Sequence, residues 1–297
     1  MRVVIAGGTG LIGTYIRKSL MKDGHEVTVL TRNPQNTWDI YWDGTNISTW
    51  TEHLESIDVL INLAGKSVDC RYNDVNKKAI YASRLGSTNI LHSAVDQSKT
   101  PPKLWINSST ATIYRHAEDR FMDEFEGEIG DGFSVDVATK WEETFFQKSV
   151  AATRKVAIRT AIVLGQEGGA YPHFRGLTRV GFGGAQGDGK QMVSWIHEED
   201  LYQSILFIIS HQNISGVINI SSPNPVNNKL FMRSIRDIYK PIIAIPIKRW
   251  MLTIGAFFLR TETELLLKSR WVLPTRLQRL GYKFRYPNLP DALSALK

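Results

Sequence analysis

The sequence predicts an α/β fold in which a doubly wound parallel β-sheet is covered by helices on both faces. Three observations lead to this expectation: the size of the chain, an alternation of strand-like and helix-like segments, and a glycine-rich turn near the start. The chain has 297 residues, of which 42% are hydrophobic and 22% are charged. That composition is ordinary for a globular protein, and the length suffices for one large domain or two small ones.

Strand-like and helix-like segments alternate through the first 165 residues. Short apolar runs that end in small residues are typical of buried strands, whereas apolar residues spaced three and four apart are typical of helices. The expected strands are 2–7, 25–32, 58–65, 103–110 and 155–165, and the expected helices are 11–24, 78–98 and 132–149. Such an alternation is typical of a parallel sheet with helices on both faces.

The glycine-rich turn AGGTGLIG lies between the first expected strand and the first expected helix. Its spacing fits G-x-x-G-x-x-G, the fingerprint of a dinucleotide site in this context. One glycine permits the tight bend, another lets backbone N–H groups approach a pyrophosphate, and Gly13 permits close helix–strand packing. The helix N-terminus then attracts the anion. We therefore expect a Rossmann-type domain in which this turn supplies the cofactor-binding residues Gly7, Gly10, Leu11, Ile12 and Gly13.

The end of the second expected strand indicates which dinucleotide binds. NAD enzymes usually place an Asp or Glu here to bind the ribose 2′-hydroxyl. This chain has Thr31 and Arg32 instead. Arg32 can bind a 2′-phosphate and Thr31 can donate a hydrogen bond to it, so we expect NADP(H) rather than NAD(H). The alternative is that Arg32 is simply a surface arginine at the end of a strand.

The regular alternation of strands and helices ends after residue 165. A glycine-rich loop, a strand end with a helix, a strand with a Pro/Asn turn and a mostly helical remainder are expected at 176–191, 194–211, 216–228 and 229–297. We predict a Rossmann domain over 1–165, its sheet completed by part of 190–225, and a smaller, mostly helical substrate-side lobe over 166–297. The apolar stretch 250–259 is too short for a bilayer span, which needs about 20 residues, so we expect a core helix there.

The charge and cysteine content narrow the partners. The formal net charge is +7, which favours an anionic ligand such as a dinucleotide phosphate, a nucleic acid or a membrane surface. The basic residues are spread along the chain, which disfavours the last two. Cys70 is the single cysteine and the histidines are scattered, so we expect no disulfide and no metal site. The N-terminal run is too short for a signal peptide, and we expect a cytoplasmic protein.

Several motifs, taken in order, resemble the extended short-chain dehydrogenases/reductases. They are GGTGLIG (7–13), INLAG (61–65), NSSTATIY (107–114), Lys140 and WIHEED (195–200). Further stretches resemble an atypical NAD(P)-dependent epimerase/dehydratase-like branch that has its own short C-terminal domain of unknown function, here expected at 248–297. They are LAGKSVDCRY (63–72), ASRLGSTNIL (82–91), TKWEE (139–143), RTAIVLGQEGGA (159–170), FGGAQGDGKQMVSWIHEEDL (182–201) and VLPTRLQRLGYKFRYPNLPDAL (272–293). The resemblance covers essentially the whole chain.

The resemblance implies an NADP(H)-type cofactor along the strand ends. Leu63, Ala64 and Gly65 would line its adenosine side, where small residues let the backbone approach. Arg84 falls where a helix passes the cofactor and would reach a phosphate, although it could equally be an exposed helix arginine. Val163 would lie near the nicotinamide.

The residues expected to carry the chemistry depart from the ordinary pattern. That mechanism needs a Ser or Thr to hold the substrate oxygen, a Tyr to transfer its proton, and a Lys to lower the pKa of the Tyr and bind the ribose. Thr110 matches the hydroxyl position, unless it only caps a loop. In GFSVDVATKWEE (132–143), Asp136 stands where the Tyr of a Tyr-x-x-x-Lys pair would precede Lys140.

Two interpretations of Lys140 remain open. Lys140 either binds the nicotinamide ribose, with proton transfer left to Asp136, Thr110, Tyr114 or a water, or it forms an ordinary ion pair with Asp136 worth about 0.3 kcal/mol. A neighbouring lysine lowers the pKa of an aspartate, which disfavours Asp136 as the acid.

The segment 181–200 is expected to cover a small-molecule substrate, with Gln191, Trp195 and His197 as candidate contacts and Asp200 as a helix N-cap. His197 is a lone histidine, so a structural hydrogen bond is at least as plausible there. Two functions follow: an NADP(H)-dependent oxidoreductase or epimerase with a nonstandard proton donor, or a non-catalytic NADP(H)-binding sensor or regulatory protein. The sequence does not indicate the substrate or the oligomeric state.

Overall fold

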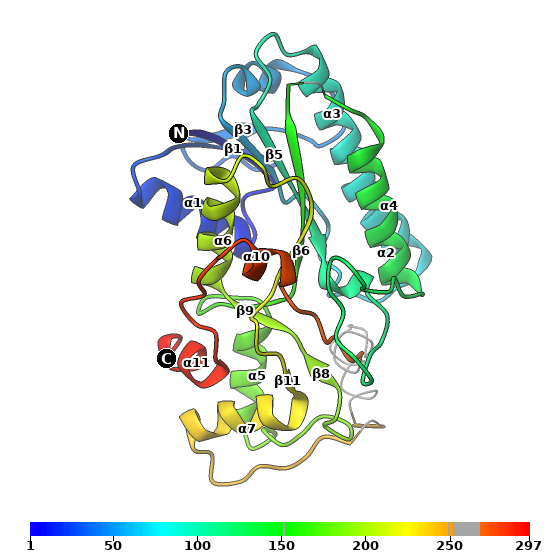
Figure 1. Cartoon of the computed structure of the whole chain (residues 1–297), viewed down its shortest axis with the longest axis vertical. Helices are drawn as coiled ribbons and strands as arrows, with labels where there is room; N and C mark the ends of the chain where they lie inside the picture. Colours follow the sequence, from blue (N-terminus) through cyan, green and yellow to red (C-terminus); the bar gives the residue numbers. More distant parts are fainter. Residues whose placement is uncertain (151, 249, 252–267) are drawn as a thin grey trace.

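The computed structural model describes residues 1–150, 152–248, 250–251 and 268–297, and it confirms the α/β class. Seven strands form one parallel sheet in the order β10-β6-β5-β4-β1-β2-β3 (Figure 1). Their bounds are β1 Arg2–Ala6, β2 Glu26–Thr31, β3 Asp39–Tyr41, β4 Val59–Asn62, β5 Leu104–Thr110, β6 Arg154–Thr160 and β10 Gly216–Ile220. From β1 the chain adds β2 and β3 on one side and then β4, β5, β6 and β10 on the other, so the strand order reverses at β1. In open α/β sheets, ligands bind in the crevice at such a switch point.

Helices cover both faces of the sheet (Figure 1). One face packs against α1 (Leu11–Lys22) and α6 (Glu198–Ser210), and the other packs against α3 (Ser87–Gln97) and α4 (Phe133–Gln147). Alternating strand residues supply the two cores: Val3 and Ile5 bury with the α1 side, whereas Val4 and Ala6 bury with the α3 side. The period of two along each strand therefore fixes which residues meet which helical layer.

Smaller elements complete the sheet domain. The helix α2 (Asp74–Tyr81) continues into α3 through a π-helical turn, η2 (Ala82–Gly86). The 3₁₀ turns η1 (Thr49–Leu54) and η3 (Ala111–Ile113) follow β3 and β5. The short helix α10 (Thr275–Arg279) lies against β10.

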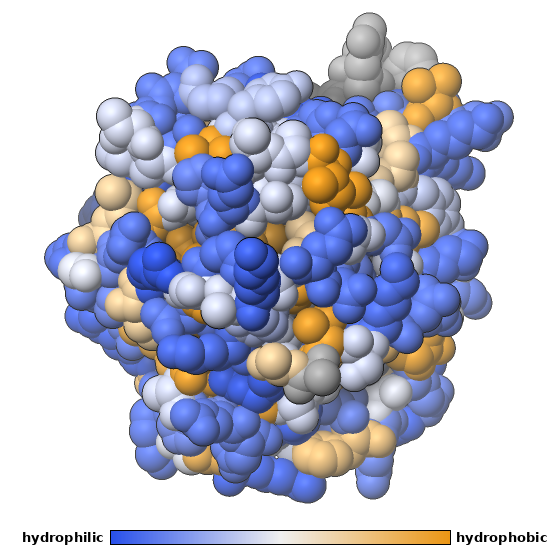
Figure 2. All heavy atoms as spheres, turned by 90° about the horizontal axis from the view of Figure 1, so that it is seen from above, coloured by the Kyte–Doolittle hydropathy of each residue, from blue (hydrophilic) through white to orange (hydrophobic). Residues whose placement is uncertain are grey.

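A second lobe packs around Tyr171, Trp195 and Phe231. It contains α5 (Ala170–Arg179), α7 (Asn228–Tyr239), α11 (Leu289–Ala295) and the antiparallel pair β8 (Met192–Val193) and β11 (Val226–Asn227). The strands β7 (Ile162–Leu164) and β9 (Trp195–His197) pair in parallel between the sheet and this lobe. Seen from the end of the molecule opposite this lobe, apolar residues lie singly or in small groups among hydrophilic ones (Figure 2).

Some elements differ from the sequence-based expectations. The strand β3 was not expected because three residues carry too little pattern, and α5 was not expected because Pro172 and Gly176 both disfavour a helix. The strand expected over 155–165 is divided into β6 and β7. The remainder from 229 is less helical than expected, because 240–248 and 280–288 are irregular. The core helix expected over 250–259 lies, beyond its first two residues, outside the described residues. No helix in the described part of the chain is long and apolar enough to span a membrane.

A buried ion pair fixes how α4 sits on the sheet. The Arg159 guanidinium donates to the Glu142 carboxylate at 2.7 Å, and the two side chains are only 12% and 10% exposed. The same carboxylate accepts a hydrogen bond from Ser109 on β5, while Arg159 also donates to the Tyr114 hydroxyl. Glu142 therefore joins α4 to both β5 and β6 and sets the rotation of the helix about its own axis.

We expect Glu142→Gln to lower the free energy of unfolding by about 3–5 kcal/mol, because it leaves the Arg159 charge buried without a counter-ion. Urea denaturation measures the loss. Glu143→Gln, at the exposed neighbouring position, is the matched control and should change stability by less than about 0.5 kcal/mol. A loss below about 1 kcal/mol for Glu142→Gln would show that the pair does not hold the helix.

Candidate functional site

The glycine turn after β1 brings the backbone close to β4. Gly7 has a φ of +75°, and a Cβ atom at Gly7 would lie 2.6 Å from the Cα atom of Ala64. A Cβ atom at Gly13 would lie 2.5 Å from the Cα atom of Gly8, so Gly13 permits α1 to pack on the turn. Gly10 differs because a Cβ atom there would meet nothing within 4 Å. Packing therefore requires glycine at Gly7 and Gly13, whereas Gly10 faces open space.

The N-terminus of α1 lies at this turn and carries no acidic residue of its own. Gly10 is the N-cap and offers no side chain, and the first turn contains no acidic residue. Leu11 packs toward the loop after β7, where Cβ atoms on Gly168 and Gly169 would touch it, and Ile12 packs on the core. The free N–H groups and the positive end of the helix dipole therefore suit a phosphate at Gly10.

Arg84 lies beside the backbone that follows β4. A Cβ atom on Gly65, just after β4, would lie 3.2 Å from the Cζ atom of Arg84. The guanidinium stacks 5.1 Å over the Trp141 ring and donates to the Lys66 carbonyl oxygen at 3.0 Å. Burial lowers the pKa of Arg84 to about 10, and no carboxylate among the described residues forms an ion pair with it. A desolvated cation of this kind is suited to bind an anionic ligand.

The remaining cofactor candidates lie at the end of β2, just after β4 and in β7. Leu63 donates its backbone N–H to the carbonyl oxygen of Ala6 at 2.8 Å, which ties β4 to β1. Val163 is buried in β7. Thr31 is buried at the end of β2, where its hydroxyl accepts the Asn33 N–H at 3.3 Å, and Arg32 is exposed beside it.

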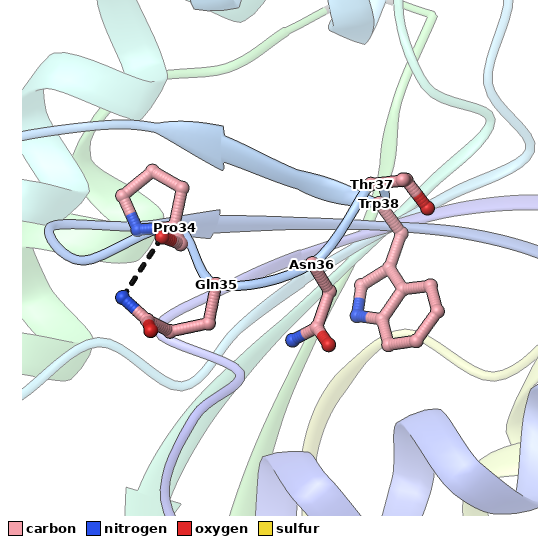
Figure 3. Close-up of a pocket in the computed structure, with 5 residues that line it drawn as sticks. All are labelled: Pro34, Gln35, Asn36, Thr37 and Trp38. Atoms are coloured by element: carbon pink, nitrogen blue, oxygen red, sulfur yellow. Dashed lines mark hydrogen bonds between the residues drawn. The ribbon is translucent and has the colours of Figure 1, made fainter.

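An open hollow of 470 Å³ follows Arg32 along the chain, and it is lined by Pro34, Gln35, Asn36, Thr37 and Trp38 (Figure 3). The Asp39 carboxylate holds the loop by accepting the backbone N–H groups of Gln35 and Asn36 at 2.9 Å each. The guanidinium of Arg17 on α1 lies 5.1 Å from the Trp38 ring centroid. The loop that follows Arg32 is therefore held in one conformation by Asp39 and Arg17.

The predicted hydroxyl position lies at the end of β5. The Thr110 hydroxyl accepts the backbone N–H of Thr112 at 3.1 Å and caps η3. Its own proton remains able to donate to a ligand oxygen. Tyr114 is fully buried, where its hydroxyl donates to Asn219 and accepts from Arg159, so Tyr114 serves the core.

Asp136 and Lys140 form the ion pair that the sequence left open. Their Oδ2 and Nζ atoms are 2.8 Å apart, and the side chains are 47% and 50% exposed. Tyr81 on α2 donates its hydroxyl to the same Asp136 oxygen, and its ring lies 5.3 Å from the Lys140 ammonium. Hydrogen bonds from Lys140 and Tyr81 lower the pKa of Asp136, which agrees with the expectation that Asp136 is not an acid. This arrangement supports the ion-pair interpretation of Lys140.

The side chains of α4 that face the sheet and α3 lie on a different flank from Lys140 and Asp136. Successive helical residues are about 100° apart, so Lys140 points about 200° away from Glu142, and Asp136 about 200° away from Ser134. Glu142 faces the sheet, whereas Trp141 faces α3 by donating its indole N–H to Thr88 at 2.9 Å. Ser134 lies seven residues before Trp141, about two helical turns away on the same flank, and its hydroxyl lies 3.4 Å from that of Tyr72.

The three substrate candidates lie in or next to β8 and β9, and all are buried: Gln191, Trp195 and His197 are 4%, 0% and 5% exposed. Each leaves one polar atom without a hydrogen-bond partner, namely Gln191 Oε1, Trp195 Nε1 and His197 Nε2. The ring of Tyr286 lies 4.1 Å from that of His197. The structure therefore buries all three candidates and gives each one unsatisfied polar atom.

The N-cap of α6 is His197, so the expectation that Asp200 caps this helix is wrong. His197 Nδ1 accepts the backbone N–H of Glu199 at 3.0 Å. Asp200 is fully buried and instead accepts the backbone N–H groups of Arg285 and Tyr286 at 2.7 and 2.8 Å. The aspartate thereby ties the C-terminal segment to α6.

Comparison with known proteins assigns the chain to a family. A model of the NAD dependent epimerase/dehydratase family matches residues 3–129, and a domain of unknown function, DUF1731, matches residues 249–296. Epimerase family protein SDR39U1 of Homo sapiens is 32% identical over 300 residues, which cover 100% of this chain and 99% of the human protein. The chain belongs to this epimerase family. The resemblance stated from the motifs is thereby confirmed.

Other members and structures agree. An epimerase family protein of Mycobacterium leprae is 31% identical over 98% of this chain and 94% of its own length. The crystal structure of human SDR39U1 (isoform 2) with NADPH superimposes with a TM-score of 0.89 at 31% identity, covering 100% of this chain and 99% of that one. A nucleoside-diphosphate sugar epimerase from Corynebacterium glutamicum gives a TM-score of 0.81 at 32% identity and covers 99% of this chain but 57% of that one.

Sequence reasoning missed the residues that orient α4 in this family member. Glu142 was not singled out, although an acidic residue next to Trp141 in the buried stripe of α4 is a signal for a buried ion pair. Tyr72 and Tyr81 were also missed, because they reach α4 from segments that are far away in the sequence. Within the ranges that the structure describes, no three His, Cys, Asp or Glu side chains form a metal site.

A pH dependence of stability follows from the burial of His197. Burial lowers the pKa of His197 to about 4, whereas an unfolded histidine titrates near 6.5. Between these values the unfolded chain binds more protons, so stability falls as the pH drops from about 6.5 to about 4. We expect His197→Gln to remove about 1–3 kcal/mol of this loss, measured by urea denaturation at pH 7 and pH 4.5. His53→Gln, at an exposed histidine, is the control. Equal pH dependence in both variants would contradict the burial of a neutral His197.

Proposed function

We propose that the protein is an NADP(H)-dependent oxidoreductase or epimerase that acts on a small molecule. The observation that carries the proposal is the glycine turn after β1, where Gly10 is sterically open and caps α1 without a side chain, together with the Arg84 guanidinium beside Gly65. A dinucleotide pyrophosphate fits this combination of steric access and positive charge. The human relative of known structure was crystallised with NADPH, which supports the same cofactor here.

Two arginines divide the recognition of phosphate between them. Arg84 lies next to Gly65, where it reaches the pyrophosphate that NADPH and NADH share. Arg32 is exposed at the end of β2, where it reaches the 2′-phosphate that only NADPH has. Thr31 contributes to the same end by shaping the turn at Asn33. Loss of Arg84 therefore affects both cofactors, and loss of Arg32 affects only one.

The side chain suited to act on a substrate lies at the end of β5. When bound, the nicotinamide supplies or accepts a hydride. The Thr110 hydroxyl donates a hydrogen bond to the substrate oxygen. The Corynebacterium relative is titled a nucleoside-diphosphate sugar epimerase, which makes nucleotide sugars the first substrates to test.

The second candidate function is a non-catalytic NADP(H) sensor. The observation that favours it is the engagement of Asp136 and Lys140 with each other and with Tyr81, which leaves no tyrosine on α4 itself at the usual place. We also propose a cytoplasmic location without nucleic-acid or membrane partners, because the basic residues are spread along the chain. Turnover of NADPH with any carbonyl substrate decides between the two functions.

We expect Arg32→Ala to weaken NADPH binding at least tenfold and to leave NADH binding within twofold, because one charge-assisted phosphate contact is worth about 1.5–3 kcal/mol. Isothermal titration calorimetry measures both affinities. Equal losses for the two cofactors, or no loss, would refute the assignment of Arg32 to the 2′-phosphate.

We expect Arg84→Met to weaken NADPH and NADH binding by the same factor, about tenfold or more, because the pyrophosphate is common to both. The matched control is Lys140→Ala, which removes an exposed charge paired with Asp136 and should change neither affinity more than twofold. A loss confined to Lys140→Ala would instead place Lys140 on the cofactor.

A further inference from the structure

Two extended segments of the second lobe lie side by side, the glycine-rich loop after α5 and the chain after α7. Ile245 donates its backbone N–H to the Gly181 carbonyl oxygen at 2.8 Å and accepts the Gly184 N–H at 3.1 Å. Ile247 continues this pairing two residues later, with Gln186 opposite it in parallel. The chain after α7 therefore lies against the loop like an added strand, at the end of the lobe away from the seven-stranded sheet (Figure 1).

The glycines of the loop make this pairing possible. A Cβ atom at Gly184 would lie 2.4 Å from the backbone nitrogen of Pro246. Gly181 has a φ of +89°, a conformation that other residues rarely adopt. The Gly183 carbonyl oxygen accepts a hydrogen bond from Arg236 on α7 at 2.6 Å, which fixes the loop from its other side. Glycine is thus required here because a second backbone lies directly against the loop.

The outer edge of the added segment is open. Alternate residues of a paired strand direct their N–H and C=O groups to opposite sides, so Ala244 points outward where Ile245 and Ile247 point to the loop. Within the described part of the chain, no group forms a hydrogen bond with the Ala244 N–H or carbonyl oxygen. The side chains of Ile242, Ile243 and Ile245 are 102%, 60% and 44% exposed. An exposed apolar edge with unpaired backbone groups is a template for pairing with another chain.

The charges beside this edge indicate which kind of chain fits it. The segments 179–187 and 240–248 contain the cations Arg179, Lys240 and Lys248 and no Asp or Glu, and all three cations are exposed. A second copy that paired antiparallel about the centre of the edge would place Lys240 opposite Lys248, and like charges in opposite positions destabilise such a pair. A strand that carries carboxylates would instead form an ion pair with each lysine.

We propose that the edge 242–246 binds an extended, acidic segment of another protein, which adds to the paired segments as a further strand. The Ala244 N–H and C=O groups hold the backbone of the added strand, the exposed isoleucines contact its apolar side chains, and the two lysines pair with its carboxylates. This interaction goes beyond the proposed function, because neither the glycine turn after β1 nor Thr110 takes part in it.

The first test measures binding to the full-length protein by fluorescence anisotropy. The probes are short fluorescein-labelled peptides in which valine alternates with glutamate, with serine or with lysine. We expect the glutamate peptide to bind about tenfold more tightly than the serine peptide, as two surface ion pairs allow, and the lysine peptide to bind most weakly. Absence of binding by the glutamate peptide, or equal affinities for the three peptides, overturns the proposal.

The second test removes the outward N–H group. Ala244→Pro eliminates this donor and keeps the hydrogen bonds that Ile245 and Ile247 make to the loop. We expect it to weaken binding of the glutamate peptide about fivefold or more, the effect of one lost main-chain hydrogen bond, with the NADPH affinity unchanged. Ala244→Ser, which keeps the N–H, is the matched control and should bind the peptide within twofold. Unchanged peptide binding in Ala244→Pro overturns the proposal.

A charge reversal gives a test that does not depend on proline. Lys240→Glu combined with Lys248→Glu should reverse the preference, so that the lysine peptide binds more tightly than the glutamate peptide. An unchanged preference overturns the assignment of the two lysines to an acidic strand.

Two other occupants are distinguishable outcomes. Sedimentation equilibrium that shows a dimer, dissociated by Ala244→Pro, would assign the edge to a second copy and overturn the proposal. Co-sedimentation with vesicles of phosphatidylglycerol and phosphatidylcholine, abolished by the double lysine substitution and unaffected by Ala244→Pro, would assign the surface to a membrane and likewise overturn it.

Discussion

The buried ion pair between Glu142 and Arg159 determines what the rest of the site can do. Because Glu142 bonds to β5 through Ser109 and to β6 through Arg159, the helix α4 has one rotation about its axis. That rotation leaves Lys140 and Asp136 half exposed beside Tyr81 and directs Trp141 to Thr88 on α3. The chemistry of the site therefore depends on a carboxylate that touches neither cofactor nor substrate.

The glycine turn provides a second constraint, which is steric. Gly7 and Gly13 are confined by the backbones of Ala64 and Gly8, so any side chain there would separate β1 from β4 or α1 from the turn. Gly10 alone remains open, at the N-terminus of α1. The close packing on either side thus leaves one access point to the backbone N–H groups, and the two cations Arg84 and Arg32 lie where the phosphates of a bound dinucleotide would extend.

The sequence predicted the features that arise from local patterns. The alternation of strands and helices, the roles of the glycines and the burial of His197 follow from residues close together in the chain. The orientation of α4 could not be predicted, because it depends on pairing between Glu142 and Arg159 across 17 residues and on the approach of Tyr72 across 62. The spacing of Asp136 and Lys140 suggested a catalytic pair, yet equal spacing exists on every flank of a helix. Only the tertiary contacts of Glu142 and Trp141 show which flank of α4 faces the sheet and which faces α3.

The account turns on which flank of α4 meets the nicotinamide. A crystal structure of the protein with bound NADP⁺ measures this most directly. We predict that Arg84 binds the pyrophosphate, and that Lys140 remains paired with Asp136. A structure in which the Lys140 ammonium leaves Asp136 and binds the ribose hydroxyls would contradict it.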